Sequence, residues 1–91
     1  METISDILSA CKALLERRYG SRFQGLLLYG STARKQAGPE SDIDLLVLLE
    51  GPFEYSHELR QIIDVLYPLQ LETDRLISAK PVSMEDFEHG R

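Results

Sequence analysis

The sequence predicts a small α/β domain, in which helices pack on a mixed β-sheet. Segments with an apolar residue at every third or fourth position alternate with short continuous apolar runs, a pattern typical of helices and strands in one domain. The 91 residues are enough for one modest core, and the hydrophobic content of 43% is ordinary for a globular protein. We therefore expect residues 1–91 to form a single domain.

The first helix is expected to begin at Thr3, because Thr3 and Asp6 have the spacing of a capping box. Gly20, which follows two arginines, is a typical helix end. The apolar face of this helix comprises Ile4, Ile7, Leu8, Cys11, Leu14 and Leu15. Since the only cysteine lies on that face, we expect a small core residue and not a redox group.

Two continuous apolar runs predict strands, at Phe23–Tyr29 and Ile43–Leu49. The first is expected to be buried on both faces, as such runs usually are. A third, weaker strand is expected at Leu76–Val82. Between the first two strands, one or two helical turns are expected at 31–35, followed by a loop at 36–41 that contains Gly-Pro.

A further helix is expected from Tyr55, which Pro68 kinks or ends. Its predicted apolar face comprises Leu59, Ile62, Ile63 and Leu66. Ser83 and Asp86 have the spacing of a second capping box, which opens a helix that the chain end at Arg91 cuts short. The resulting order, α-β-α-β-α-β-α, indicates a mixed sheet with helices packed on it.

Charge and composition restrict the partners. The net charge is −5, and the basic residues form only short pairs, at 17–18 and 34–35, so we expect no direct binding of nucleic acid. No apolar run approaches the roughly 18 residues that span a bilayer, and the first residues carry acids where a secretory signal carries bases. One cysteine permits no internal disulfide. A cytoplasmic protein is therefore expected. The two histidines, His57 and His89, are expected to be exposed.

The most informative stretch runs from Leu28 to Val47. Because side chains alternate along a strand, Asp42 and Asp44 are expected to point to one face and Ile43 to the other. Two neighbouring carboxylates repel each other unless a cation lies between them. Carboxylate oxygens suit Mg²⁺, which usually binds one or two carboxylates together with substrate phosphates. Asp42 and Asp44 are therefore candidate metal ligands of a nucleotide site.

The predicted strand that ends at Tyr29 is followed directly by Gly30-Ser31. Glycine permits a close approach of the backbone to a phosphate, and the N–H groups at a helix N-terminus favour anions. Arg34, one turn later, is placed to neutralise a triphosphate. A Walker A loop is not present in the sequence. Asp-x-Asp, Gly-Ser or a single arginine does not by itself indicate a nucleotide site. Their order, with Gly-Ser after one predicted strand and Asp-x-Asp at the start of the next, is specific for such a site.

Gly30-Ser31, ten intervening residues and Asp42-Ile43-Asp44 resemble the GS-x10-DxD signature of the DNA polymerase β-type nucleotidyltransferases. The longer string GSTARKQAGPESDIDLLV is similar to the minimal nucleotidyltransferases, or MNT proteins, the antitoxin halves of HEPN/MNT toxin–antitoxin pairs. The closing stretch LISAKPVSMEDFEHG is also similar to that family, so the resemblance covers most of the chain.

The resemblance implies the polymerase β-like nucleotidyltransferase fold. It also implies that Gly30 and Ser31 hold nucleotide phosphates and that Asp42 and Asp44 bind Mg²⁺. The implied reaction is transfer of AMP from ATP to a tyrosine hydroxyl of a HEPN-type RNase toxin, which the chain would neutralise as an antitoxin.

The sequence departs from the family pattern at two places. Lys35 replaces the usual glycine after the arginine. The superfamily also carries a third carboxylate on a later strand, as metal ligand and base, and the predicted strand Leu76–Val82 contains none. Glu72 and Asp74 precede that strand and would serve only if it began earlier.

Two alternatives stay open beside the antitoxin enzyme. One is a module with weak or no catalysis that neutralises a partner by binding it. The other is a small-molecule (antibiotic) nucleotidyltransferase, which is disfavoured because such enzymes use an extra domain to hold the sugar. The sequence does not fix the base preference, the acceptor residue or the oligomeric state, and it is compatible with an oligomer.

Overall fold

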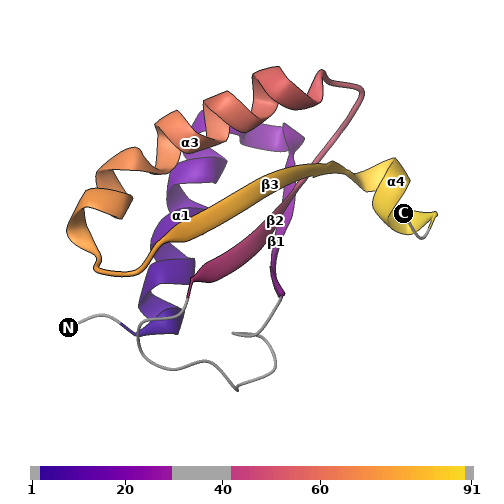
Figure 1. Cartoon of the computed structure of the whole chain (residues 1–91). Coiled ribbons are helices and arrows are strands. Elements are labelled where there is room, and N and C mark those ends of the chain that lie inside the picture. Colours follow the sequence, from indigo (N-terminus) through magenta and orange to yellow (C-terminus); the bar gives the residue numbers. More distant parts are fainter. Residues whose placement is uncertain (1–2, 30–41, 90–91) are drawn as a thin grey trace.

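The protein is described here from a computed structural model, which describes residues 3–29 and 42–89. Within these residues a three-stranded sheet has the order β1-β2-β3. Helices α1 and α3 pack against each other and against the sheet, and α4 lies at one end of it (Figure 1). The elements are α1 Ile4–Tyr19, a 3-10 turn Gly20–Arg22, β1 Phe23–Tyr29, β2 Ile43–Leu49, α3 Tyr55–Glu72, β3 Ile77–Ser83 and α4 Met84–Glu88.

The sheet is mixed, as predicted. β1 pairs with β2 antiparallel, and β3 pairs with β2 parallel. The bounds of β1 and β2 agree with the sequence-based prediction, and β3 begins and ends one residue later than expected. The helical turn expected at 31–35 and the loop at 36–41 lie outside the described residues.

Helix α1 begins as predicted, at a capping box. The Thr3 hydroxyl accepts from the Asp6 amide, and the Asp6 carboxylate accepts from the Thr3 amide, so two N–H groups that the helix leaves unpaired are satisfied. The helix ends before Gly20, whose φ of 58° lies in a region that favours glycine. Ser83 caps α4 in a similar way, since its hydroxyl accepts from the Asp86 amide.

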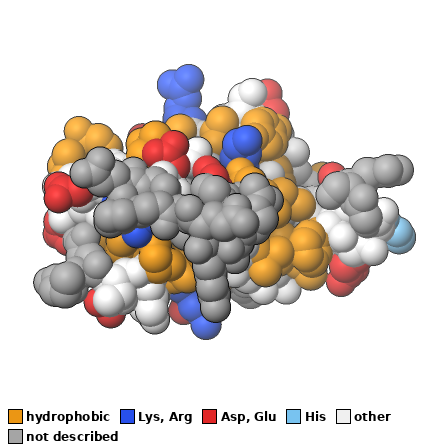
Figure 2. All heavy atoms as spheres, turned by 60° about the horizontal axis from the view of Figure 1, so that its bottom comes forward, with side chains coloured by type: hydrophobic (Ala, Val, Ile, Leu, Met, Phe, Trp, Pro, Cys, Tyr) orange, Lys and Arg blue, Asp and Glu red, His pale blue; other side chains and the backbone are white. Residues whose placement is uncertain are grey.

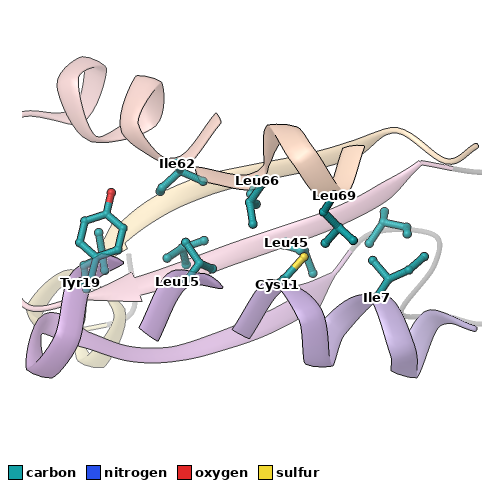
Figure 3. Close-up of a cluster of buried hydrophobic side chains, with 12 residues drawn as sticks. Ile7, Cys11, Leu15, Tyr19, Leu45, Ile62, Leu66 and Leu69 are labelled. Carbon is teal, nitrogen blue, oxygen red and sulfur yellow. The ribbon is translucent and has the colours of Figure 1, made fainter. Parts of the chain in front are cut away.

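The core lies between the two long helices and one face of the sheet (Figure 3). Ile7, Cys11 and Leu15 point from α1 toward α3, which contributes Ile62, Leu66 and Leu69 to the same layer. The four residues of β2 that alternate toward this layer are Ile43, Leu45, Val47 and Leu49, each 0% exposed. Cys11 is a core residue, as predicted, and burial raises the pKa of its thiol to about 11. Packing of this face is what holds the short helices and strands together.

Two expectations about burial were wrong, and one of two alternatives for Pro68 is excluded. β1 contains no buried residue, and Leu27 is 37% exposed, because β1 is an edge strand of the described sheet and contacts the core with one face only. Ile63 is 55% exposed, because the buried face of α3 centres on Ile62 and Leu66, one helical position away. Pro68 does not end α3, which continues to Glu72.

A buried carboxylate links the end of α1 to the start of α3. Glu58 is 6% exposed and accepts a hydrogen bond of 2.9 Å from the Tyr19 hydroxyl. Arg22 forms an ion pair with its other oxygen at 3.5 Å. The guanidinium groups of Arg18 and Arg22 each lie 5.5 Å from the centre of the Tyr19 ring. Because every member has a partner, this cluster stabilises the contact between the helices.

Candidate active site

Asp42 and Asp44 lie where β2 begins. Asp42 directly precedes the strand and is exposed, and Asp44 is its second residue and half-buried. Ile43, between them, is fully buried in the core. Since side chains alternate along a strand, Asp44 points to the face of the sheet opposite the core. We call this opposite face the open face; it carries the alternate residues of all three strands that do not enter the core.

The strand register places two hydroxyl groups beside Asp44 on the open face. Tyr29 of β1 is its partner on one side, and Ser78 of β3 is its partner on the other. The next row of this face consists of Leu27, Leu46 and Lys80. Neighbouring strands are about 4.8 Å apart, so these side chains are within reach of one ligand. The open face thus presents oxygen donors in one row and an exposed lysine in the next.

Gly30, Ser31 and Arg34, the residues predicted to bind the nucleotide, lie outside the described residues. β1 ends at Tyr29, directly opposite Asp44. The chain therefore leaves β1 at the end of the sheet where Asp42 and Asp44 enter β2. Of the predicted geometry, the described residues show that the end of β1 and the start of β2 lie at the same end of the sheet.

No carboxylate stands beside Asp44 on β3, where Ser78 takes that place. Glu72 is the last residue of α3, Asp74 lies in the bend after it, and both are exposed. β3 begins at Ile77, so neither residue is on the strand. Within residues 3–29 and 42–89, no group of three or more His, Cys, Asp or Glu side chains is close enough to hold a metal.

Tyr29, Ser78 and Lys80 are neighbours of Asp44 that the sequence alone did not predict. Alternation along β3 puts Ser78 and Lys80 on one face, but alternation alone does not say which face meets Asp44. That information lies in the register between β2 and β3, which depends on how α3 packs and carries no local sequence signal. The Tyr29 pairing depends in the same way on the register between β1 and β2.

Basic side chains at this end of the molecule are scattered. Figure 2 turns this end forward, and the basic side chains of the described residues that are visible in it are separated from one another. His57 and His89 are both exposed, as expected. None of the helices in the described part of the chain is long and apolar enough to cross a membrane.

A comparison with known families agrees with this geometry. The family model described as "nucleotidyltransferase domain" matches residues 8–86, which include the three strands of the described sheet, all of α3 and most of α1. The chain belongs to the nucleotidyltransferase domain family. A search of the curated proteins found no match. The small mixed sheet with helices packed on it is consistent with the fold of these nucleotidyltransferases, as the sequence predicted.

Membership in this family implies nucleotidyl transfer as the class of chemistry, with a nucleoside triphosphate as substrate. Nucleotidyltransferases typically also use a divalent metal. The Asp42 and Asp44 carboxylates of this nucleotidyltransferase domain suit one, because carboxylate oxygens are the hard ligands that Mg²⁺ prefers.

Proposed function

We propose that residues 1–91 act as one domain that transfers AMP from ATP to a hydroxyl group of a partner protein, with Mg²⁺. The observation that carries this proposal is the position of Asp44. Asp44 lies on the open face, two residues after Asp42 and opposite the end of β1. Its neighbours on the two adjoining strands are Tyr29 and Ser78, which both carry hydroxyl groups. In the described part of the chain, the core and both long helices lie on the other side of the sheet, so neither stands between Asp44 and an acceptor chain.

In this proposal Asp42 and Asp44 hold Mg²⁺, and Gly30, Ser31 and Arg34 hold the phosphates of ATP. When bound, Mg²⁺ neutralises charge on the triphosphate and on the leaving pyrophosphate. The acceptor oxygen forms a bond to the α-phosphorus, the bond to the bridging oxygen breaks, and pyrophosphate leaves. The acceptor loses its hydroxyl proton, for which a carboxylate at the site or water is the base.

The partner is proposed to be a HEPN-type RNase toxin, and the acceptor a tyrosine. The similarity of the glycine-serine and aspartate motifs to those of MNT antitoxins supports this.

The test is intact mass of the candidate toxin after incubation with this protein, ATP and Mg²⁺. The proposal predicts a gain of one or more AMP units. Asp42→Asn and Asp44→Asn should each abolish the gain without unfolding the protein, because both side chains lie outside the core. Transfer that is unaltered in either variant would falsify the assigned roles.

A second candidate function is favoured by Ser78. A serine stands beside Asp44 on β3, where a carboxylate could complete a metal site and accept the proton of the acceptor. Without that group, the domain would bind a metal–nucleotide complex and a partner while transferring slowly. It would then neutralise the partner chiefly by binding to it.

Ser78→Asp distinguishes the two functions. If the serine limits catalysis, this variant should raise the rate of AMP transfer, since general-base catalysis typically contributes about 10²–10⁴-fold. Ser83→Asp, at the other end of the same strand, is the matched control and should leave the rate unchanged. If Ser78→Asp instead lowers the rate of AMP transfer below that of the wild type, the result favours the first proposal, in which the wild-type protein is an active enzyme.

A further inference from the structure

The side chain of Gln70 ties the end of α3 to the start of β3. Its Oε1 accepts a hydrogen bond of 2.8 Å from the Ile77 amide, and its Nε2 donates one of 2.7 Å to the Arg75 carbonyl. Gln70 is half-buried and lies two residues before the helix ends. Because one partner is a donor and the other an acceptor, both ends of the side-chain amide are used and its orientation is fixed.

Thr73 holds the same connection at a second point. It follows the last residue of α3 and is 8% exposed, and its hydroxyl accepts a hydrogen bond of 3.3 Å from the Arg75 amide. The backbone of Arg75 is therefore held at its N–H by Thr73 and at its carbonyl by Gln70. Residues 73–76 connect α3 to β3, and these bonds restrict how that connection can move.

A single peptide unit extends this constraint to β2. The amide of Ile77, which Gln70 holds, and the carbonyl of Leu76 belong to the same planar trans peptide, whose N–H and C=O point in opposite directions. That carbonyl accepts a hydrogen bond of 2.8 Å from the Ile43 amide. Hydrogen bonds in such a chain also polarise and strengthen one another. Gln70 thus fixes the plane of the peptide that holds Ile43.

Ile43 is the residue between the two aspartates of the candidate site. Its side chain is 0% exposed in the core and its amide is bonded to Leu76, so its backbone is held from two directions. Asp42 precedes it, before β2 begins, and Asp44 follows it in the strand. Any movement of the Ile43 backbone would therefore displace both carboxylates.

We propose that Gln70 is a positioning residue of this site, which acts through the peptide before Ile77 and the Ile43 amide to hold the Asp42 and Asp44 carboxylates in place for Mg²⁺. This inference rests on the proposed role of the two aspartates. Mg²⁺ demands nearly ideal octahedral geometry with oxygens at about 2.0–2.1 Å, so it tolerates little displacement of its ligands. Groups that orient metal ligands from outside typically contribute about 10–100-fold in metal affinity or activity.

A role of Gln70 in stability alone makes a different prediction. If its bonds only stabilised the fold, their loss would raise the exchange of amide protons throughout the core. It would also lower the fraction of protein that binds a ligand, at unchanged affinity. A positioning role instead confines the change in exchange to the contacts that lead to Ile43, and it changes the affinity at unchanged stoichiometry.

Hydrogen exchange of single amides, followed by NMR on the protein without ligand, tests the contacts. Gln70→Met removes both hydrogen bonds at a similar side-chain volume. It should raise the exchange of the Ile77 and Ile43 amides by about ten-fold relative to amides in the middle of α1. Gln61→Met is the matched control, because Gln61 lies on the same helix and its side chain accepts from Arg18. The control should leave the exchange of Ile43 unchanged.

Calorimetric titration with Mg²⁺ and a non-hydrolysable ATP analogue tests the effect on the site. Gln70→Met should bind about ten-fold more weakly at unchanged stoichiometry. Gln70→Glu, which keeps an acceptor for the Ile77 amide, should recover most of the affinity and most of the protection of Ile43. Gln61→Met should bind as the wild type does.

Three results would overturn the proposal: unchanged exchange of Ile43 in Gln70→Met, faster exchange throughout the core of that variant, or faster exchange of Ile43 with unchanged affinity. A wild type that binds no Mg²⁺–ATP would contradict the proposed function instead. In that case, the exchange of the Ile43 amide would still decide whether Gln70 orders the segment that carries the aspartates.

Discussion

At the scale of single residues, the polar link between Tyr19 and Glu58 is the clearest case of a side-chain contact that stabilises the fold. A buried carboxylate is costly unless its oxygens are hydrogen-bonded. Here the Tyr19 hydroxyl and the Arg22 guanidinium satisfy one oxygen each. No local pattern in the sequence announces this contact, because its partners are 39 residues apart and Glu58 occupies a helix position that is normally solvated.

Tyr19→Phe should destabilise the protein by about 1–3 kcal/mol, because it leaves a buried carboxylate oxygen without its donor. The free energy of unfolding from urea titration measures this. Tyr55→Phe, at a tyrosine that is 48% exposed, is the control and should change little. Equal stability of the two variants would show that the hydrogen bond contributes nothing.

The same contact predicts a pH dependence. Burial, and then the hydrogen bond to Glu58, raise the pKa of Tyr19 from 10.0 to about 12. The unfolded state therefore loses this proton at lower pH than the folded state. The stabilisation is complete below pH 10 and is lost as the pH rises from about 10 to 12. Over that window, stability should fall more steeply for the wild type than for Tyr19→Phe; parallel curves would contradict the shift.

Lys80 provides a residue-scale test of the open face. It is exposed, and it lies in the row next to Asp44, where a triphosphate bound by the aspartates would be within reach of its charge. Lys80→Ala should weaken the binding of Mg²⁺–ATP by a few-fold, since an exposed charge contact contributes about 0–1 kcal/mol. Lys12→Ala, on an exposed position of α1, should have no effect in the same calorimetric titration.

At the scale of elements, local signals predicted most of the structure. The capping box predicted the start of α1, and Gly20 predicted its end. The two continuous apolar runs predicted the bounds of β1 and β2 to the residue. The errors arose where tertiary packing outweighs local preference. Ile63 belongs to the same apolar cluster in the sequence as Ile62, but the sheet covers only one of them.

Pro68 is the strongest case of packing that outweighs preference. A proline inside a helix removes a backbone hydrogen bond and is about 3 kcal/mol less favourable than alanine. The helix nevertheless continues, because Leu66 and Leu69 on both sides of Pro68 are buried in the core. Burial of these two leucines offsets the cost of the proline.

Pro68→Ala should therefore stabilise the protein, by about 1–2 kcal/mol, because it restores the hydrogen bond while the packing stays the same; the gain is reduced by the greater freedom of the unfolded chain. Thermal and urea unfolding measure it. Ser9→Ala, at an exposed position in α1, is the control and should gain only a few tenths of a kcal/mol. A destabilised Pro68→Ala would mean that the ring itself packs in the native state.

At the scale of the whole molecule, the sequence predicted the fold class, and it did not predict how the strands pair. β1 pairs with β2 antiparallel, and β2 pairs with β3 parallel. These directions depend on how the strands pack against α1 and α3 in the common core. That pairing decides that Ser78, and not Glu72 or Asp74, stands beside Asp44. The roles of Asp42, Asp44, Gly30, Ser31 and Arg34 stay predictions.

The most direct test of the central claim is calorimetric titration of the protein with a non-hydrolysable ATP analogue, with and without Mg²⁺. It needs no partner protein, and comparison of the wild type with Asp44→Asn isolates the contribution of that carboxylate to binding. The account predicts binding that requires Mg²⁺ and is lost in Asp44→Asn, with the variant as stable as the wild type. Binding that is equal in the wild type and in Asp44→Asn, or absent from the folded wild type, would contradict it.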